Sequence, residues 1–361
     1  MDNSNNAVYT IGICKEMCPS SEARLREKQG LLHILEVVPG TEHHKNPKAD
    51  LKRVVKEFTR SAAGKSFLIT ENLRPPDVLL KTINYLLDEV ISNNEKVPWM
   101  VKYDFILDRL RAVRQDMVIQ NVSRPHQIVI LQPIIRFLTY SSYRCCEEAI
   151  NTFDPHINNT HLQECLKRLL CTYDYFDNLE KSSKQEISSD FLVESRPYFE
   201  SLYLIFNLGD VNALNRYLNL PPQWRSSLVK TSMRICLNYV NRNISKVIKL
   251  FKQLPLSLQM IAFLHMPEIR RITLKIMSSA YHSKNLTFPL DVLSDMLLYN
   301  CVDELIKDCN YYGLKIQQDG VHFMKSDFLE DKAKVKPRRS EEIDKTLKDT
   351  DISMFLLYGD H

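Results

Sequence analysis

"GDVNALNRYLNLPP" at residues 209–222 and "NISKVIKLFKQLPL" at residues 243–256 carry the same pattern at an offset of 34 residues. Both place apolar residues at helical spacing and a proline at the exit, in the pairs Ala213/Val247, Leu214/Ile248, Tyr217/Phe251, Leu220/Leu254 and Pro221/Pro255. A further helix is expected between the two segments, over about 224–240. A helix pair that repeats every ~34 residues has the size of a tetratricopeptide-type unit. The sequence therefore predicts a stack of helical repeats.

The residues after this repeat predict a winged helix. A helix at 266–282 precedes two short amphipathic segments within 288–313. The next run, LKIQQDGVHFM (314–324), alternates apolar and polar residues around Asp319 and Gly320. An Asp-Gly pair between alternating runs is a strong hairpin signal. Helices followed by a β-hairpin are the order of elements in the tail of a winged helix.

Upstream of the repeat, helices also dominate from residue 73 onward. Their apolar residues recur every three or four positions, which is the helical period. The expected helices lie at 73–92, 99–121, 125–147, 158–180 and 197–208. We therefore expect a mainly all-α chain, with strands only in the hairpin.

The composition excludes several classes of protein. The chain has 361 residues but only 8 glycines, which argues against a Gly-rich phosphate loop, a Rossmann turn or a hairpin-rich β protein. The net charge of +4 names no polyanionic partner. Nine cysteines without a signal peptide indicate reduced thiols in an intracellular protein. No apolar run approaches ~20 residues, so no membrane span is expected.

These patterns divide the chain into five expected parts. Residues 1–11 form a disordered leader, and 12–72 hold an N-terminal motif and loops. Residues 73–265 form the helical-repeat domain, and 266–330 form the winged helix. Residues 331–361 form a mobile charged tail.

The N-terminal motif carries a family resemblance. The run GICKEMCPSSEARLRE (12–27) resembles the N-terminal signature of the GANP family, the mRNA-export scaffolds related to the yeast suppressor-of-actin protein. The matching residues are Gly12, Cys14, Met17, Cys18, Pro19, Glu22, Arg26 and Glu27. LRPPDVLLKTINYL (73–86) and YDFILDRLRAVRQDM (103–117) resemble two helices of the same family. The resemblance covers about 12–330.

The resemblance implies a function. Helical repeats that end in a winged helix are the PCI-like architecture of several scaffold subunits. The chain is most similar to the short SAC domain-containing members, which implies a non-enzymatic scaffold in centrosome duplication and spindle progression. An mRNA-export subunit is the alternative. The implied partners are a PCI-type subunit and a small acidic peptide subunit, and the implied locations are nucleus and cytoplasm, with centrosome and spindle.

Cys14 and Cys18 allow three interpretations. Zinc requires four ligands, usually in pairs such as C-x2-C, and no second pair follows here. A catalytic thiol requires a neighbouring base and an oxyanion donor, and no histidine groups with either cysteine. The third interpretation is packing, because free cysteine behaves as a small hydrophobe. We favour packing, and we expect no metal, no cofactor and no enzyme, although a zinc- or thiol-dependent enzyme remains the alternative.

Basic residues form two helical clusters. Lys246, Lys249 and Lys252 share one helix face, and Arg270, Arg271 and Lys275 follow on a later helix. A third cluster lies in the tail at 332–339. The clusters either bind RNA weakly through its phosphates or serve as solvated faces.

The expected recognition helix of the winged helix, 301–312, has the opposite charge. It carries Asp303, Glu304 and Asp308 against Lys307 alone. Phosphates would repel such a helix in a DNA groove, so we expect no readout of duplex DNA.

The hairpin of the winged helix offers an edge strand that a partner could cover. Interfaces concentrate binding energy in a few apolar or aromatic anchors. The candidate anchors are Tyr311, Tyr312 and Phe323, of which one could instead fill the core of the domain.

Overall fold

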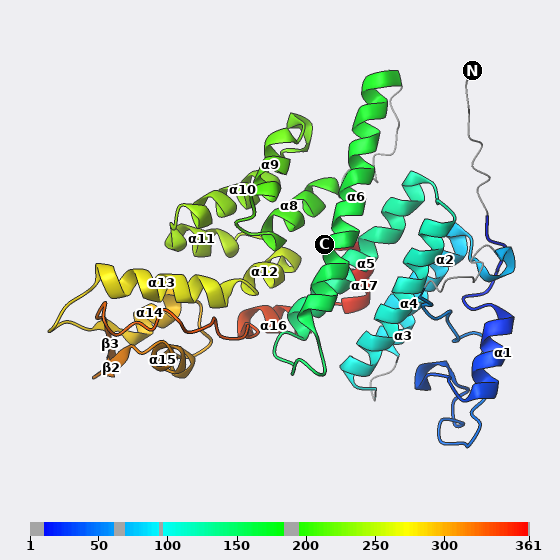
Figure 1. Cartoon of the computed structure of the whole chain (residues 1–361), viewed down its shortest axis with the longest axis horizontal. Coiled ribbons are helices and arrows are strands. Elements are labelled where there is room, and N and C mark those ends of the chain that lie inside the picture. Colours follow the sequence, from blue (N-terminus) through cyan, green and yellow to red (C-terminus); the bar gives the residue numbers. More distant parts are fainter. Residues whose placement is uncertain (1–10, 61–68, 94–96, 184–194, 360–361) are drawn as a thin grey trace.

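The computed structural model describes residues 11–60, 69–93, 97–183 and 195–359. These residues are mostly helical with one small three-stranded sheet, which confirms the predicted fold class (Figure 1). Helix α1 (Ser20–Gln29) lies at one end of the longest axis, and the winged helix lies at the other (Figure 1). No helix in the described ranges has the length and apolar character to cross a bilayer.

The first half of the stack follows the expected helices. α2 (Pro76–Asn84) runs through a π-helical turn, η3 (Tyr85–Glu89), into α3 (Val90–Ser92). Pro76 occupies the first turn of α2, where its missing N–H costs no hydrogen bond. The long helices are α4 (Trp99–Ile119), α5 (Arg124–Arg144) and α6 (Pro155–Ser183).

The internal repeat corresponds to two helix pairs. Ala213 and Val247 are both buried at equivalent places, and Pro221 and Pro255 both stand in extended backbone before the next helix. The helices of this region are α8 (Arg196–Phe206), α9 (Val211–Asn219), α10 (Ser227–Val240), α11 (Ile244–Phe251) and α12 (Leu256–Phe263). The register read from the sequence is therefore the register of the fold.

A winged helix follows, as predicted. Its sheet has the strand order β1-β3-β2, with both pairs antiparallel. Its elements are α13 (Met266–Ala280), β1 (Phe288–Pro289), α14 (Leu290–Met296), α15 (Val302–Tyr311), β2 (Lys315–Gln317) and β3 (Gly320–His322).

The hairpin turn lies one residue earlier than its Asp-Gly signal suggests. Gln317 pairs with Gly320, so the turn consists of Gln318 and Asp319, and Gln318 adopts the positive φ of 53°. Gly320 instead begins β3, where a Cβ atom would lie 2.6 Å from the Cβ of Thr287. Because Gly320 has no side chain, β1 can pair closely with β3; the sequence pattern did not predict this strand.

The expected mobile tail at 331–361 is ordered over the described residues 331–359. It contains α16 (Glu341–Lys348) and α17 (Ile352–Tyr358) and returns from the winged helix to the centre of the stack, where α17 packs on α5 and η3 (Figure 1). Phe355 and Leu356 are buried there. Apolar residues at helical spacing thus outweigh the charged composition on which the prediction was based.

One apolar core runs through the stack, the winged helix and the tail. The domain boundaries at 72/73 and 265/266 therefore stay predictions, because no break in packing locates them. Of the expected disordered leader, residues 1–10 lie outside the described residues.

Candidate functional site

The N-terminal motif begins as an extended segment laid on the start of the stack. The N–H of Gly12 donates to Oε1 of Gln120 at 2.8 Å, and the N–H of Cys14 donates to the carbonyl oxygen of Leu73 at 3.0 Å. A Cβ atom at Gly12 would lie 2.2 Å from that same carbonyl oxygen. Only glycine allows this close approach.

Both motif cysteines are buried thiols. Burial raises the pKa of Cys14, and it raises the pKa of Cys18 to about 12. A nucleophilic cysteine requires a lowered pKa, so neither thiol is activated at neutral pH. Within the described ranges, no three or more His, Cys, Asp or Glu side chains gather at one point to hold a metal. The predicted packing role fits this geometry.

Arg26 of the motif belongs to a buried ion cluster, here called the Glu36 cluster, whose members are Arg26, Glu36, Glu57 and Arg109. Glu36 accepts from Nη1 of Arg26 at 2.6 Å and from Nη2 of Arg109 at 3.2 Å. Burial tends to raise the pKa of Glu36, but the charges of Arg109 and Arg26 outweigh it and hold that pKa below its usual value. The cluster fastens α1 to α4.

A second buried ion cluster, the Asp116 cluster, consists of Lys56, Arg74 and Asp116. Asp116 accepts from Nζ of Lys56 at 2.6 Å and from Nε of Arg74 at 2.7 Å. Arg74 also donates to the carbonyl oxygen of Met17 at 3.2 Å. Asp116 of α4 thus holds Lys56, in the chain after the motif, and Arg74, two residues before α2, and it is linked to the motif through Arg74.

The remaining motif residues are also structural. Pro19 caps the N-terminus of α1. Glu22 accepts from the N–H of Glu57 at 2.8 Å, and Glu27 pairs with Lys48 at 2.9 Å on the surface. The motif therefore builds a junction and does not present a reactive group.

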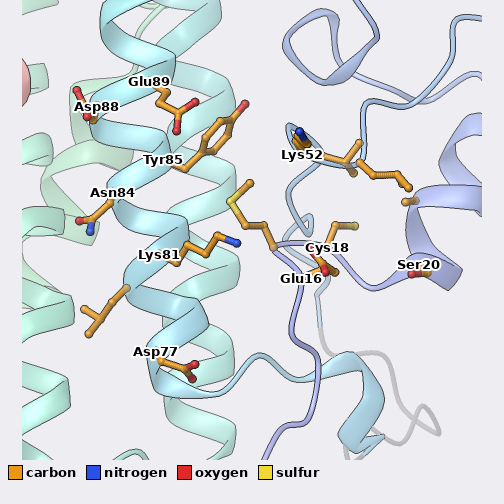
Figure 2. A pocket seen from close by; sticks show the side chains of 15 residues that line it. Glu16, Cys18, Ser20, Lys52, Asp77, Lys81, Asn84, Tyr85, Asp88 and Glu89 are labelled. Carbon is orange, nitrogen blue, oxygen red and sulfur yellow. The ribbon is translucent and has the colours of Figure 1, made fainter.

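A hollow of about 1160 Å³ separates the motif from α2 and η3 (Figure 2). Lys81 extends from α2 toward the segment that carries Glu16 and Cys18 (Figure 2). The Cys18 thiol donates to the carbonyl oxygen of Pro19 at 3.6 Å and accepts from Nη2 of Arg26 at 3.4 Å. Burial outweighs the charge of Arg26 in setting its pKa, so this thiol is not activated. Carboxylates from both walls outnumber cations, with Glu16, Asp77, Asp88 and Glu89 against Lys52 and Lys81.

The structure corrects two of the three expected partner anchors. Tyr312 is 0% exposed and Phe323 is 1% exposed. Tyr312 stacks on Phe328 with ring centroids 5.7 Å apart, and Phe323 meets Phe288 edge-on. Both rings fill the core of the winged helix, because the β-hairpin closes over them. Tyr311 is 39% exposed and stays a prediction.

Arg270, expected on an RNA-binding face, is also a core residue. Its side chain donates through Nε to the carbonyl oxygen of Leu297 at 3.1 Å and through Nη2 to that of Leu298. Its guanidinium lies 3.8 Å from the ring centroid of Tyr299. The role expected of it is wrong, because these contacts bury the cation.

The other members of that cluster bind the chain after the hairpin. Arg271 donates to the carbonyl oxygens of Glu330 and Lys332, and Lys275 pairs with the Glu330 carboxylate at 3.0 Å. Lys246 and Lys249 of α11 and Lys252, the residue just after it, are exposed, and their proposed contact with RNA stays a prediction.

Helix α15 carries acidic side chains on its exposed face, and its buried carboxylate is paired with an arginine. Asp303 is exposed, whereas Asp308 is buried and accepts from Arg338 of the tail at 2.7 Å and from the hydroxyl of Tyr299 at 3.0 Å. The absence of duplex DNA readout stays a prediction, now based on Asp303 and Glu304 rather than on Asp308.

A second hollow, of about 930 Å³, lies among α4, α5 and α6 and is rich in arginine. The sequence does not predict this hollow, because its cations come from three helices and no single helix shows a basic stripe. The only available signal is the arginine content of 111–124 together with Lys167 and Arg168.

Comparison with known proteins identifies the family of this chain. The family model described as SAC3/GANP family matches residues 17–318. The chain is similar to SAC3 family protein 1 of Schizosaccharomyces pombe, with 26% identity over 87% of this chain and 31% of that protein. It is also similar to SAC3 family protein B of Arabidopsis thaliana (30% identity, 48% of this chain, 10% of that protein) and to Protein xmas of Drosophila melanogaster (25%, 86% and 15%). The chain spans about a third or less of these relatives.

Proposed function

The chain belongs to the SAC3/GANP family, and on that premise we propose that it is a non-enzymatic scaffold subunit that holds a second, PCI-type subunit. Stacked helix pairs offer long surfaces for protein partners. The winged helix at the end of this stack adds an open sheet edge, because among the described residues β2 pairs with β3 and with no other strand. A small acidic peptide subunit is a further proposed partner, supported by the family resemblance.

The observation that carries the proposal is apolar surface beside the open edge. Tyr311 is 39% exposed and Leu329 is 45% exposed. The two residues lie close together, since the N–H of Leu329 donates to the carbonyl oxygen of Tyr312 at 2.9 Å. Tyrosine is among the residue types that contribute most binding energy in protein interfaces, and neighbouring side chains such as Leu329 exclude water around it.

Affinity purification of the tagged chain from cells tests this interface. We expect a PCI-type subunit to co-purify with the wild type and to be lost with Tyr311→Asp and Leu329→Asp together. The matched control is Val211→Asp with Leu218→Asp, two exposed apolar residues of α9. Partner retention by the folded winged-helix variant would place the interface elsewhere, and a wild-type eluate without a PCI-type subunit would contradict the proposal itself.

We further propose that the cellular role is centrosome duplication and spindle progression, with the protein in nucleus and cytoplasm and at the centrosome and spindle. The resemblance to the short SAC domain-containing members supports this role. Depletion followed by counting of centrosomes tests it. Nuclear retention of polyadenylated RNA with normal centrosome numbers would favour the alternative, an mRNA-export subunit.

Weak RNA binding is a second candidate function, supported by the exposed lysines of α11. Lys246 and Lys249 lie on the outside of that helix, and exposed Lys252 is the residue just after it. Changing all three to Glu should flatten the salt dependence of binding, since each phosphate contact contributes about 0.7 to the logarithmic slope for single strands. An unchanged slope would place any RNA contact elsewhere.

A further inference from the structure

The arginine-rich hollow has an excess of positive charge, whereas the charges of the whole chain nearly balance. Its walls come from α4, α5 and α6, which are neighbours in the stack (Figure 1). Among its described lining residues, Glu164 is the only carboxylate, against Arg111, Arg114, Arg124, Lys167 and Arg168. The whole chain has a net charge of only +4, so this hollow concentrates positive charge that is otherwise balanced.

Most of these cations have no carboxylate partner. Arg114 pairs with Glu164 at 2.9 Å. Within the described part of the chain, Arg111, Arg124 and Lys167 form no ion pair; Arg111 lies over the ring of Phe58 at 3.9 Å, and Arg124 lies over Tyr175 at 4.6 Å. Aromatic rings orient these guanidinium groups without neutralising them.

The positive charges converge on one place. Burial lowers the pKa of Arg168, and the nearby charges of Arg124 and Arg114 lower it further. Burial likewise lowers the pKa of His161, with Arg114 and Arg111 adding to the effect. Like charges held this close repel one another, so a bound anion would reduce the electrostatic repulsion among these cations.

The residue types indicate the anion. Four of the five cations are arginines, whose planar forks match phosphate oxygens in pairs. A phosphomonoester places about −1.5 to −2 charges on one small group, whereas a carboxylate or a nucleic-acid phosphodiester brings a single charge. A convergent cluster therefore suits a compact phosphomonoester better than a strand of evenly spaced phosphodiesters.

The same hollow has an apolar side. Half-buried Ile119 lines it, and Val118 at its rim is 50% exposed. Aliphatic groups beside an arginine cluster can receive the side chains that flank a phosphorylated residue. We propose that this hollow binds a phosphorylated serine- or threonine-containing segment of a partner protein. This site lies outside the proposed winged-helix interface and does not depend on it.

A degenerate fluorescent peptide library with one fixed phosphoserine provides the probe. The matched library carries serine at that position, and oligouridylate RNA is a third ligand. Each is titrated against the full chain by fluorescence anisotropy. We expect the phosphoserine library to bind about tenfold or more tightly than the serine library, because only the phosphate forms charge-assisted bonds to several arginines.

The test variant is Arg124→Glu with Lys167→Glu. Both residues are exposed, and Glu suits position 124 because it begins α5, where the helix dipole favours negative charge. The control is Lys246→Glu with Lys249→Glu, which changes the net charge equally on another exposed surface. We expect the Arg124→Glu, Lys167→Glu variant to bind the phosphopeptide about tenfold or more weakly, and the control variant to keep the wild-type affinity.

Three results would overturn the proposal. The first is equal binding of the phosphoserine and serine libraries. The second is unchanged phosphopeptide binding by the Arg124→Glu, Lys167→Glu variant. The third is RNA that binds more tightly than the phosphopeptide and loses its binding in that variant. Should the double Glu variant lose its helical circular dichroism, Arg124→Gln with Lys167→Gln provides the same comparison without charge reversal.

Discussion

The N-terminal segment, 11–60, and the winged helix, 266–330, lie at opposite ends of the molecule (Figure 1), and they differ in how much buried charge holds them in place. The winged helix closes over apolar side chains such as Leu305, Val321 and Phe323, each no more than 1% exposed. The N-terminal segment contributes Met17, Leu35 and Val55 to the main core, and in addition it is held by the Glu36 cluster and the Asp116 cluster, whose two central carboxylates are fully buried.

The difference concerns specificity as much as stability. Apolar packing tolerates substitutions of similar volume, whereas a buried carboxylate between two cations requires each partner in place. Cys18, Ala23 and Val54 form a small apolar cluster of their own beside the main core. The segment therefore depends on geometry that a few ionic residues define.

The largest effect is expected in the apolar region. Phe323→Ala should lower the free energy of unfolding by about 3–5 kcal/mol, because it leaves a cavity beside Phe288 and Val321. Urea titration followed by circular dichroism measures it. A loss below about 1 kcal/mol would mean that the hairpin does not close the core as described.

The ionic region should respond strongly to a change that preserves shape. Glu36→Gln removes one negative charge between Arg26 and Arg109 and should cost about 3 kcal/mol. Glu27→Gln, which weakens the exposed pair with Lys48, should cost less than about 1 kcal/mol. Equal losses in the two variants would show that burial of the ion pair is unimportant here.

The contributions of His265 and Glu36 to folding stability should be lost at different pH values. His265 joins the stack to the winged helix, and its Nε2–H donates to the carbonyl oxygen of Ile205 at 2.8 Å. Burial lowers the pKa of His265 to about 4 from 6.5. The unfolded chain therefore takes up this proton first, and stability is lost as the pH falls from 6.5 toward 4. The lowered pKa of Glu36 preserves its contribution until the pH falls below 4.5.

From pH 7 to pH 5, His265 should account for about 2 kcal/mol of lost stability. His265→Gln should remove that part of the slope, as measured by urea titration at both pH values. The pKa values of half-buried His33 and His161 are also lowered by burial, so a residual slope in the same direction is expected. An identical slope in wild type and variant would refute the assignment to His265.

A small loss of stability is expected at the motif cysteines. Cys14→Ser with Cys18→Ser should cost about 1 kcal/mol, because hydroxyl groups replace thiols in a buried place. Differential scanning fluorimetry would detect the lowered melting midpoint. Elemental analysis of the wild type should find no zinc; stoichiometric zinc lost in the double variant would reverse this interpretation.

The sequence predicted the elements whose residues repeat at a fixed period. The paired helices of the repeat and the hairpin both follow from local patterns, with Pro221 and Pro255 at matching places. The family signature located the motif but gave no reason for it. That reason lies in contacts between residues far apart, such as Arg26 with Arg109 through Glu36.

The errors share a physical cause. Composition suggested a solvated tail and exposed anchors, but burial depends on what a helix packs against. Arg270 looks like its neighbour Arg271 in sequence, yet only the former points into the core. The arginine-rich hollow was missed for the same reason, since three helices must assemble before its charges meet.

The ordered tail also sets the order in which the protein can be completed. Nη1 of Arg136 donates to the carbonyl oxygen of Leu357 at 2.8 Å, a contact between residues 221 positions apart. At a synthesis rate of about 5–20 residues per second, α5 leaves the ribosome on the order of 10–40 s before α17 exists. During that interval Tyr140 lacks its neighbour Phe355, and an apolar face of the nascent chain stays uncovered. The fold is therefore finished only after α17 has been synthesised, and until then its centre is open to chaperones and to other nascent chains.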